Sequence, residues 1–72
     1  MKITDRNQLS AHDRVELRRG RRRVEGEVEH VGLDAVRLGA GRRRVTAVWL
    51  HGHRQPFQFR VFGGWALVSA DR

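Results

Sequence analysis

Two arginine-rich pentapeptides are the segments of this chain best suited to chemistry. Gly-Arg-Arg-Arg-Val occurs at residues 20–24 and again at residues 41–45. Each copy joins a turn glycine to three cations and then to the first core residue of a predicted strand. The planar guanidinium group of arginine forms two hydrogen bonds at once to a phosphate or to a base edge. The two triplets therefore predict a surface that binds a polyanion.

The overall charge favours the same kind of partner. The 72 residues include 15 Lys and Arg against 8 Asp and Glu, which gives a net charge of +7, and Lys2 is the only lysine. A GC-rich genome would also favour arginine, and arginines in turns keep small β-proteins soluble and block pairing between strand edges. We expect polyanion binding because three arginines lie close together in each of two turns.

Acidic residues limit where this surface can lie. The three glutamates of residues 21–30 cancel the three arginines there, so this segment carries no net charge. Residues 31–54 carry a net charge of +4, from five arginines and one aspartate. We therefore expect the binding surface at the turns and near Arg37 and Arg54.

Histidines are the only residues that suggest a metal. The chain has no cysteine, which excludes disulfides, thiolate zinc sites and cysteine nucleophiles. His51 and His53 would share one face of a strand, but a tetrahedral site would need a third ligand from His12 or His30. His30 is predicted to point inward opposite Val36, as a hydrogen-bonded core group. We therefore predict no metal site.

Nothing in the sequence predicts catalysis. Ser10 and Ser69 are the only serines, neither lies near a His–acid pair, and no paired carboxylates occur in an apolar setting. The glycines match neither a P-loop nor a dinucleotide-binding fingerprint. We expect a protein that is not an enzyme, with no cofactor and no small-molecule substrate.

The short apolar runs and the lack of a signal peptide predict a cytoplasmic protein with no membrane segment.

Strands joined by turns must position these residues. Residues 1–72 are predicted to form a single small all-β domain, in which residues 1–13 are extended or form one helical turn. Apolar and polar residues alternate along most of the remaining chain, with a turn every eight to twelve positions. This pattern predicts a barrel or meander of five or six antiparallel strands. The first four strands are expected at residues 14–19, 24–30, 36–38 and 44–50.

Glycines set the predicted register of the hairpins. A two-residue turn at residues 20–21 would pair Leu17 with Val24. A three-residue turn at residues 32–34 would separate the second strand from the third. The sequence does not determine whether the connection at residues 39–41 has three or four residues.

A C-terminal β-hairpin is the clearest predicted element. Residues 57–62 and 65–70 flank Gly63-Gly64, and paired glycines supply the positive φ that a two-residue turn requires. One face is predicted to be core: Phe57, Phe59, Val61, Ala66, Val68 and Ala70. The other face carries Phe62, Trp65 and Leu67, and the strand at residues 44–50 is apolar on both of its faces. Together they offer more apolar surface than one barrel can cover. This surplus predicts a homo-oligomer or a protein partner.

The turns that carry the arginines are predicted to meet. Alternate connections of an up-and-down meander emerge at the same end of the sheet, so the turns at residues 20–21, 39–41 and 63–64 would cluster. Arginines would then bind phosphates, and the neighbouring aromatic rings would stack on bases. The predicted nucleic-acid-binding residues are Arg18, Arg19, Arg21, Arg22, Arg23, Arg42, Arg43, Arg44, Phe62 and Trp65.

Residues 14–38, about one third of the chain, resemble two families of small SH3-like barrels. The segments that carry the resemblance are Arg14–Gly20, Val24–Val28 and Asp34–Leu38. They resemble the first motif of Sm-like proteins and the strand-turn-strand of KOW-type domains, while residues after Arg44 do not resemble the second Sm motif. The resemblance implies an SH3-like barrel that binds nucleic acid.

Together these observations predict a non-catalytic domain that binds RNA or DNA, mainly through backbone contacts of its arginine-rich turns. The alternative is a protein-interaction or self-assembly module that uses the apolar outer face of the C-terminal hairpin.

Overall fold

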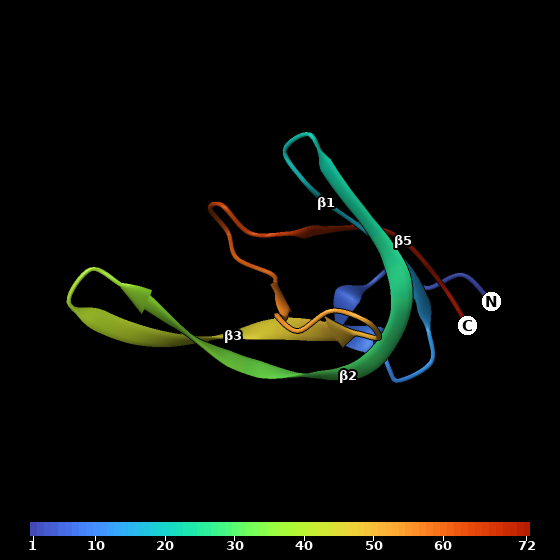
Figure 1. Cartoon of the computed structure of the whole chain (residues 1–72), viewed down its shortest axis with the longest axis horizontal. Coiled ribbons are helices and arrows are strands. Elements are labelled where there is room, and N and C mark those ends of the chain that lie inside the picture. The colour runs from blue at the N-terminus through green and yellow to red at the C-terminus, as the bar shows by residue number, and fades with distance from the viewer.

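Five antiparallel strands form one open sheet in the computed structural model, which describes all 72 residues apart from the side chain of Leu38. The order across the sheet is β4-β3-β2-β1-β5 (Figure 1). The strands are β1 (Arg14–Arg19), β2 (Arg22–Leu38), β3 (Gly41–Leu50), β4 (Phe57–Gln58) and β5 (Ala66–Asp71). The all-β prediction is confirmed, and the sheet does not close into a barrel.

The N-terminal part of the fold follows the sequence pattern closely. The expected helical turn is the 3-10 helix η1 (Arg6–Gln8), which begins after Asp5, whose carboxylate accepts a hydrogen bond from the Asn7 N–H. The β1–β2 hairpin has the predicted two-residue turn, and Leu17 lies opposite Val24. No helix in the described chain has the length and apolar character needed to cross a membrane.

Strand β2 is much longer than predicted. The expected turn at residues 32–34 does not exist, because Gly32 pairs with Ala47 and Asp34 pairs with Val45 in an uninterrupted ladder with β3. Gly32 does not have a positive φ, so it is not used as a turn residue. A continuous strand satisfies the backbone groups of both strands through their whole length, which a three-residue third strand could not do. The true turn is the two-residue Gly39-Ala40.

A bend in the middle of β2 gives the sheet its curvature. The first part of β2 pairs with β1 and the remainder pairs with β3, with a register shift between Val28 and His30. Figure 1 shows β2 curving strongly through this region. Gly26 lies close to the core here, since a Cβ atom at this position would meet Leu50 Cδ1 at 3.2 Å. The bend lets both parts of the sheet pack on one core.

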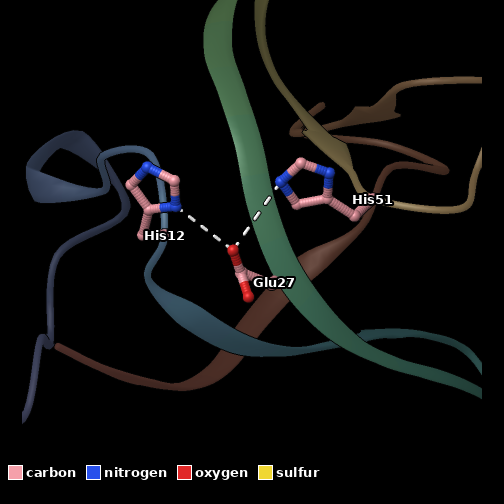
Figure 2. Close-up of side chains that lie close together, drawn as sticks. All are labelled: His12, Glu27 and His51. Atoms are coloured by element: carbon pink, nitrogen blue, oxygen red, sulfur yellow. Dashed lines mark hydrogen bonds and ion pairs between the residues drawn. The ribbon is translucent and has the colours of Figure 1, made fainter.

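Two neighbouring segments are fastened to this bend by backbone hydrogen bonds. The His12 N–H donates to the Val28 carbonyl at 2.7 Å, and the His51 N–H donates to the Glu27 carbonyl at 3.0 Å. Figure 2 shows the side chains of His12 and His51 on either side of Glu27. The loop before β1 and the end of β3 are therefore both held against the middle of β2.

The predicted C-terminal hairpin is wrong. Residues 57–58 pair with β3 and residues 66–71 pair with β1, so the two segments lie at opposite edges of the sheet. This pairing adds each segment to an existing sheet, where its backbone groups and apolar side chains are covered, whereas a separate two-stranded hairpin is marginally stable. Phe57, Phe59 and Ala70 are buried as expected, but Val61, Ala66 and Val68, also expected in the core, are exposed. Trp65, expected on the outer face, is only 8% exposed.

The two edges of the sheet come together beside Trp65. The Trp65 N–H donates to the Gln58 carbonyl at 2.8 Å, and the rings of Trp65 and Phe57 meet edge to face with centroids 5.0 Å apart. Residues 59–65 therefore cross from one edge of the sheet to the other. They cover the end of the core that an open sheet would leave exposed to water.

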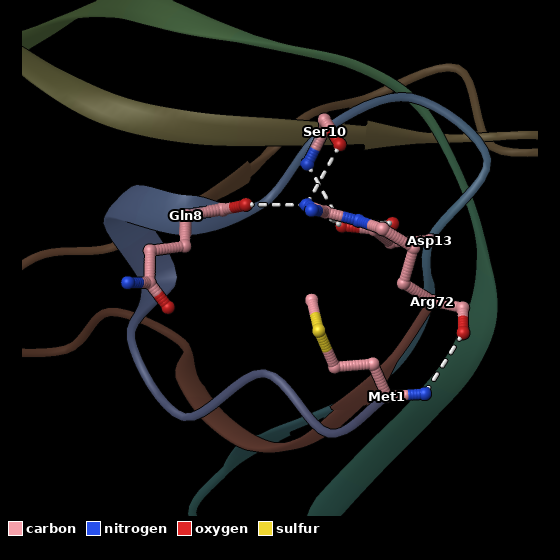
Figure 3. A network of polar contacts seen from close by, with 5 residues as sticks. All are labelled: Met1, Gln8, Ser10, Asp13 and Arg72. Carbon is pink, nitrogen blue, oxygen red and sulfur yellow. Dashed lines mark hydrogen bonds and ion pairs between the residues drawn. The ribbon is translucent and has the colours of Figure 1, made fainter.

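An ion pair between the buried Asp13 carboxylate and the half-exposed Arg72 guanidinium joins the N-terminal loop to the C-terminal residue (Figure 3). Asp13 is 1% exposed, and its carboxylate accepts hydrogen bonds from the Ser10 N–H at 2.9 Å and from Arg72 Nε at 3.1 Å. The Arg72 guanidinium also donates to the Gln8 carbonyl, and the Met1 ammonium donates to the Arg72 carbonyl. These contacts fix the N-terminal loop against the C-terminal residue.

Arg72 also determines the protonation of Asp13. Its hydrogen bonds lower the pKa of the Asp13 carboxyl below the ordinary value of 3.8, and they outweigh burial, which acts in the opposite direction. The Asp13 carboxylate in turn raises the pKa of the Arg72 guanidinium.

We predict that Asp13 makes the protein sensitive to acid. Since its folded-state pKa lies below the unfolded value near 3.8, its stabilising effect is complete above that pH and is lost as pH falls through the folded-state pKa. Asp13→Asn should lower the free energy of unfolding at neutral pH by about 1–3 kcal/mol and flatten its decline at acid pH. Urea unfolding across a pH series measures both effects. An equally steep acid decline in the variant would contradict the assignment.

Candidate nucleic-acid interface

The two arginine triplets do not meet at their turns. The turns at residues 20–21 and 39–40 lie at opposite ends of β2, because β2 is one continuous strand. The β2–β3 ribbon extends along the long axis of a molecule that measures 41 × 24 × 23 Å (Figure 1). The predicted cluster of three turns is therefore wrong, and of its residues only Arg19, Arg22, Arg43, Phe62 and Trp65 border adjoining hollows.

The arginines of the first triplet and its neighbours contact different partners. Arg23 forms an ion pair with Glu16 at 3.2 Å, and the neighbouring Arg18 donates from Nε to the Gly20 carbonyl at 2.8 Å. Arg21 is exposed in the turn. Two other arginines of this hairpin, Arg19 and Arg22, instead lie over Trp65.

Cation–π contacts hold these two arginines in place. The Arg19 guanidinium lies 4.9 Å from the centre of the Trp65 ring, and that of Arg22 lies 5.9 Å from it. Such contacts orient a guanidinium while leaving its hydrogen-bond donors free. Neither side chain forms an ion pair with a described residue.

A groove of about 450 Å³ runs beside these arginines. Arg19 and Arg22 come from the β1–β2 hairpin, and Arg54 comes from the loop between β3 and β4. We call this feature the Trp65 groove. Its lining consists of Arg19, Arg22, Val24, His53, Arg54, Gln55, Pro56, Phe57 and Trp65.

The second triplet reaches a different hollow. Arg42 and Arg44 are exposed on β3, and Arg42 lies opposite Arg37 of β2. Strand β4 pairs only with Ala47 and Val48, so it does not cover this end of β3. Arg43 instead borders a hollow of about 270 Å³ next to the exposed ring of Phe62. We call it the Phe62 hollow, and its lining consists of Arg43, Val45, Phe59, Arg60, Val61 and Phe62.

A third, smaller hollow connects the first two. It shares Arg19 and Trp65 with the Trp65 groove and Arg60 with the Phe62 hollow. Arginines of both triplets thus border the segment of residues 54–65 from two sides. We call the surface formed by these three adjoining hollows the arginine track, which comprises Arg19, Arg22, Arg43, Arg54, Arg60, Phe62 and Trp65. Within the described part of the chain, no aspartate or glutamate lines any of the three hollows.

Sequence reasoning missed Arg60 as a member of this surface. Its alternation with Phe59 and Val61 placed it in a hairpin strand, whereas the structure places it in the connection between the two edges of the sheet. Arg60 becomes recognisable only when the pairing of β4 and β5 is known. Of the two arginines that the segment charges indicated, Arg54 lines the Trp65 groove, whereas Arg37 lies opposite Arg42 on the β2–β3 ribbon.

The histidines are also arranged differently from the prediction. His53 contacts Phe57 edge to face at 5.2 Å and lines the Trp65 groove, whereas His51 faces Glu27 and Glu29. His30 is exposed, because the register shift in β2 turns it outward against Trp49, with ring centroids 4.9 Å apart.

Comparison with protein-family models, with curated proteins and with solved structures gives no match. The candidate site is therefore interpreted from its geometry and charge.

We predict that Gly64 is essential to the shape of the track. A Cβ atom at Gly64 would collide with the backbone nitrogen of Arg60 and lie 2.7 Å from its carbonyl oxygen. Gly64→Ala should therefore lower the free energy of unfolding by about 1–3 kcal/mol and expose Trp65 to solvent. Chemical denaturation followed by tryptophan fluorescence measures the loss.

Gly32→Ala is the matched control for this substitution. A Cβ atom at Gly32 would meet the ring of His30, which is exposed and able to move aside. We expect a loss below about 1 kcal/mol, because only a flexible side chain has to shift. Equal losses in the two variants would contradict the proposed packing of the connection.

Proposed function

We propose that this protein is a non-catalytic nucleic-acid-binding domain that holds the phosphate backbone of RNA or DNA along the arginine track. One observation carries the proposal: three adjoining hollows are lined by five arginines and, among the described residues, by no carboxylate. Concentrated positive charge in a concave surface attracts a polyanion more strongly than the same charge spread over a convex one.

The contacts of the arginines support a role in phosphate binding. Arg19 and Arg22 are oriented by the Trp65 ring, so less side-chain entropy is lost when they bind a ligand. Trp65 is itself buried beneath them, and it therefore positions the arginines rather than stacking on a base. Arg54, from the loop between β3 and β4, lines the same groove.

Phe62 supports a preference for single strands. Its side chain is 87% exposed beside Arg43 and Arg60. An exposed aromatic ring next to cations is the arrangement that binds one unpaired base by stacking and the adjacent phosphates by charge. A base inside a duplex has no free face for such a contact. Phe62 thus takes the stacking role in this proposal.

The architecture is consistent with this proposal. We further propose that the sheet is a partly open SH3-like barrel, because the contacts of Trp65 with Gln58 and Phe57 bring its edges together. The resemblance of residues 14–38 to Sm-like and KOW-type domains implies the same class of fold and the same class of ligand. A nucleic-acid role based on that resemblance alone would be an analogy.

Self-assembly is a second candidate function. The predicted hairpin face does not exist, but Val61 and Phe62 are 90% and 87% exposed at the tip of the connection. Adjacent exposed apolar side chains of this size favour burial against a second copy of the chain. Sedimentation of the wild type and of Phe62→Ser distinguishes this candidate, since assembly would be lost in the variant without any nucleic acid present.

We predict that the track arginines set the salt dependence of binding. Titration of short RNA and DNA strands at about 50 to 200 mM salt should give an affinity that falls steeply with salt. The double variant Arg19→Gln/Arg22→Gln should bind more weakly. Its slope of log affinity against log salt should be shallower by about 1.4 for a single strand, or about 0.7 for each lost phosphate contact.

Lys2→Gln/Arg14→Gln is the matched control, because it removes the same charge outside the three hollows. We expect it to retain most of the wild-type slope. The proposal fails if the wild type does not bind at low salt, or if both double variants lose the same affinity.

A further inference from the structure

A histidine–glutamate cluster lies outside the arginine track. His12 precedes β1, Glu27 lies in the middle of β2 and His51 follows β3 (Figure 2). Glu27 Oε1 is 3.2 Å from His12 Nδ1 and 3.7 Å from His51 Nε2. One nitrogen or oxygen donor from each residue lies within 4.8 Å of the others. None of the three residues lines the hollows described above.

The backbone fixes the separation of these three residues. The His12 N–H donates to the Val28 carbonyl at 2.7 Å, and the Val28 N–H donates to the Asp13 carbonyl at 2.8 Å. The His51 N–H donates to the carbonyl of Glu27 itself at 3.0 Å. Their Cα atoms are therefore held by main-chain bonds to the bend of β2, and only the side chains need to move to receive a ligand.

The backbone conformation of His12 is a second, independent observation. Its φ of +77° is the only positive value at a non-glycine residue in the described chain. A positive φ is uncommon at a non-glycine residue, although histidine adopts it more readily than most, and here main-chain hydrogen bonds of His12 and Asp13 to Val28 hold it. Here the imposed conformation directs the imidazole toward Glu27. Backbone strain of this kind concentrates at ligand-binding positions.

The surroundings of His51 also match those of a metal ligand. Its Nε2 faces Glu27, and its Nδ1 lies 3.8 Å from Glu29 Oε2. A metal-binding histidine typically presents one ring nitrogen to the ion and the other to a carboxylate, which orients the ring and increases its basicity. Glu29 is placed to be that carboxylate. Glu27 and Glu29 also supply negative charge for a divalent cation.

We propose that His12, Glu27 and His51 bind a divalent transition-metal ion, with Zn²⁺ as the reference ion. Two imidazoles and one carboxylate suit zinc, nickel and copper. Three protein ligands leave a fourth position for water. In tetrahedral zinc sites the ligand atoms are about 3.3 Å apart, so the exposed side chains have to move by only about 1 Å. The ion replaces the hydrogen bond between His12 and Glu27.

Metal binding at this position ties three segments of the chain together. His12 belongs to the loop fixed by Asp13, Glu27 to the bend of β2 and His51 to the end of β3. An ion bound only by the folded state raises the unfolding temperature as its concentration increases. The site therefore acts as a metal-dependent clamp on the bend.

The experiment is a calorimetric titration of the untagged protein with Zn²⁺, followed by thermal unfolding with and without the ion. We expect one ion per chain and a higher unfolding temperature in its presence. His12→Asn and His51→Ala should weaken binding by about 100-fold or more, and Glu29→Gln by about tenfold. Asparagine is used at residue 12 because it tolerates the left-handed backbone.

His53→Ala is the control, because His53 is an exposed histidine outside the cluster. It should bind Zn²⁺ as tightly as the wild type does. Visible absorption of the Co²⁺ complex provides a second readout, since His12→Asn should lose the spectrum while keeping its metal-free unfolding temperature. The proposal is overturned if the wild type binds no ion, or if His53→Ala and His12→Asn weaken binding equally.

Discussion

The uninterrupted pairing of β2 is the constraint on which the rest of the structure depends. This strand pairs with β1 through its first part and with β3 through the remainder, and it bends between the two near Gly26 and Val28. The bend allows one short chain to cover both sides of a single core. It also separates the two hairpin turns, and with them the two arginine triplets. The positions of the cations, the glutamates and the histidines all follow from this strand.

An open, bent sheet needs a segment that covers the space between its edges. Residues 59–65 provide it, since they lead from β4 on one edge to β5 on the other and bury Trp65 on the way. Because the β1–β2 hairpin and β3 flank this segment, arginines from both triplets reach it. The glutamates lie elsewhere: Glu16 on β1 pairs with Arg23, and Glu27 at the bend of β2 lies beside His12 and His51. The arginine track is thus free of carboxylates, and the histidine–glutamate cluster lies outside it; both proposals depend on this separation.

The sequence correctly predicted the structural features that depend on residues close together in the chain. The β1–β2 register follows from alternation and one turn glycine, and the structure confirms it at Leu17 and Val24. The turn expected at residues 32–34 does not form, because the local turn preference of Gly32 and Asp34 is outweighed by continuous pairing with β3. Gly63-Gly64 does not form the predicted two-residue hairpin turn, because β4 pairs with β3 and β5 pairs with β1. Likewise, His12 and Glu27 are 15 residues apart, and no short motif connects them.

The central claim is that a single strand of nucleic acid lies along the arginine track. The most direct test is a titration of isotopically labelled protein with a short single-stranded oligonucleotide, followed by amide and guanidinium NMR shifts. The largest changes are predicted at Arg19, Arg22, Arg43 and residues 54–65, and the resonances of Glu27 and Glu29 should change little. Saturable binding with its largest shifts on the glutamate side of the β2 bend, or confined to the turn at residues 39–40, would contradict the claim.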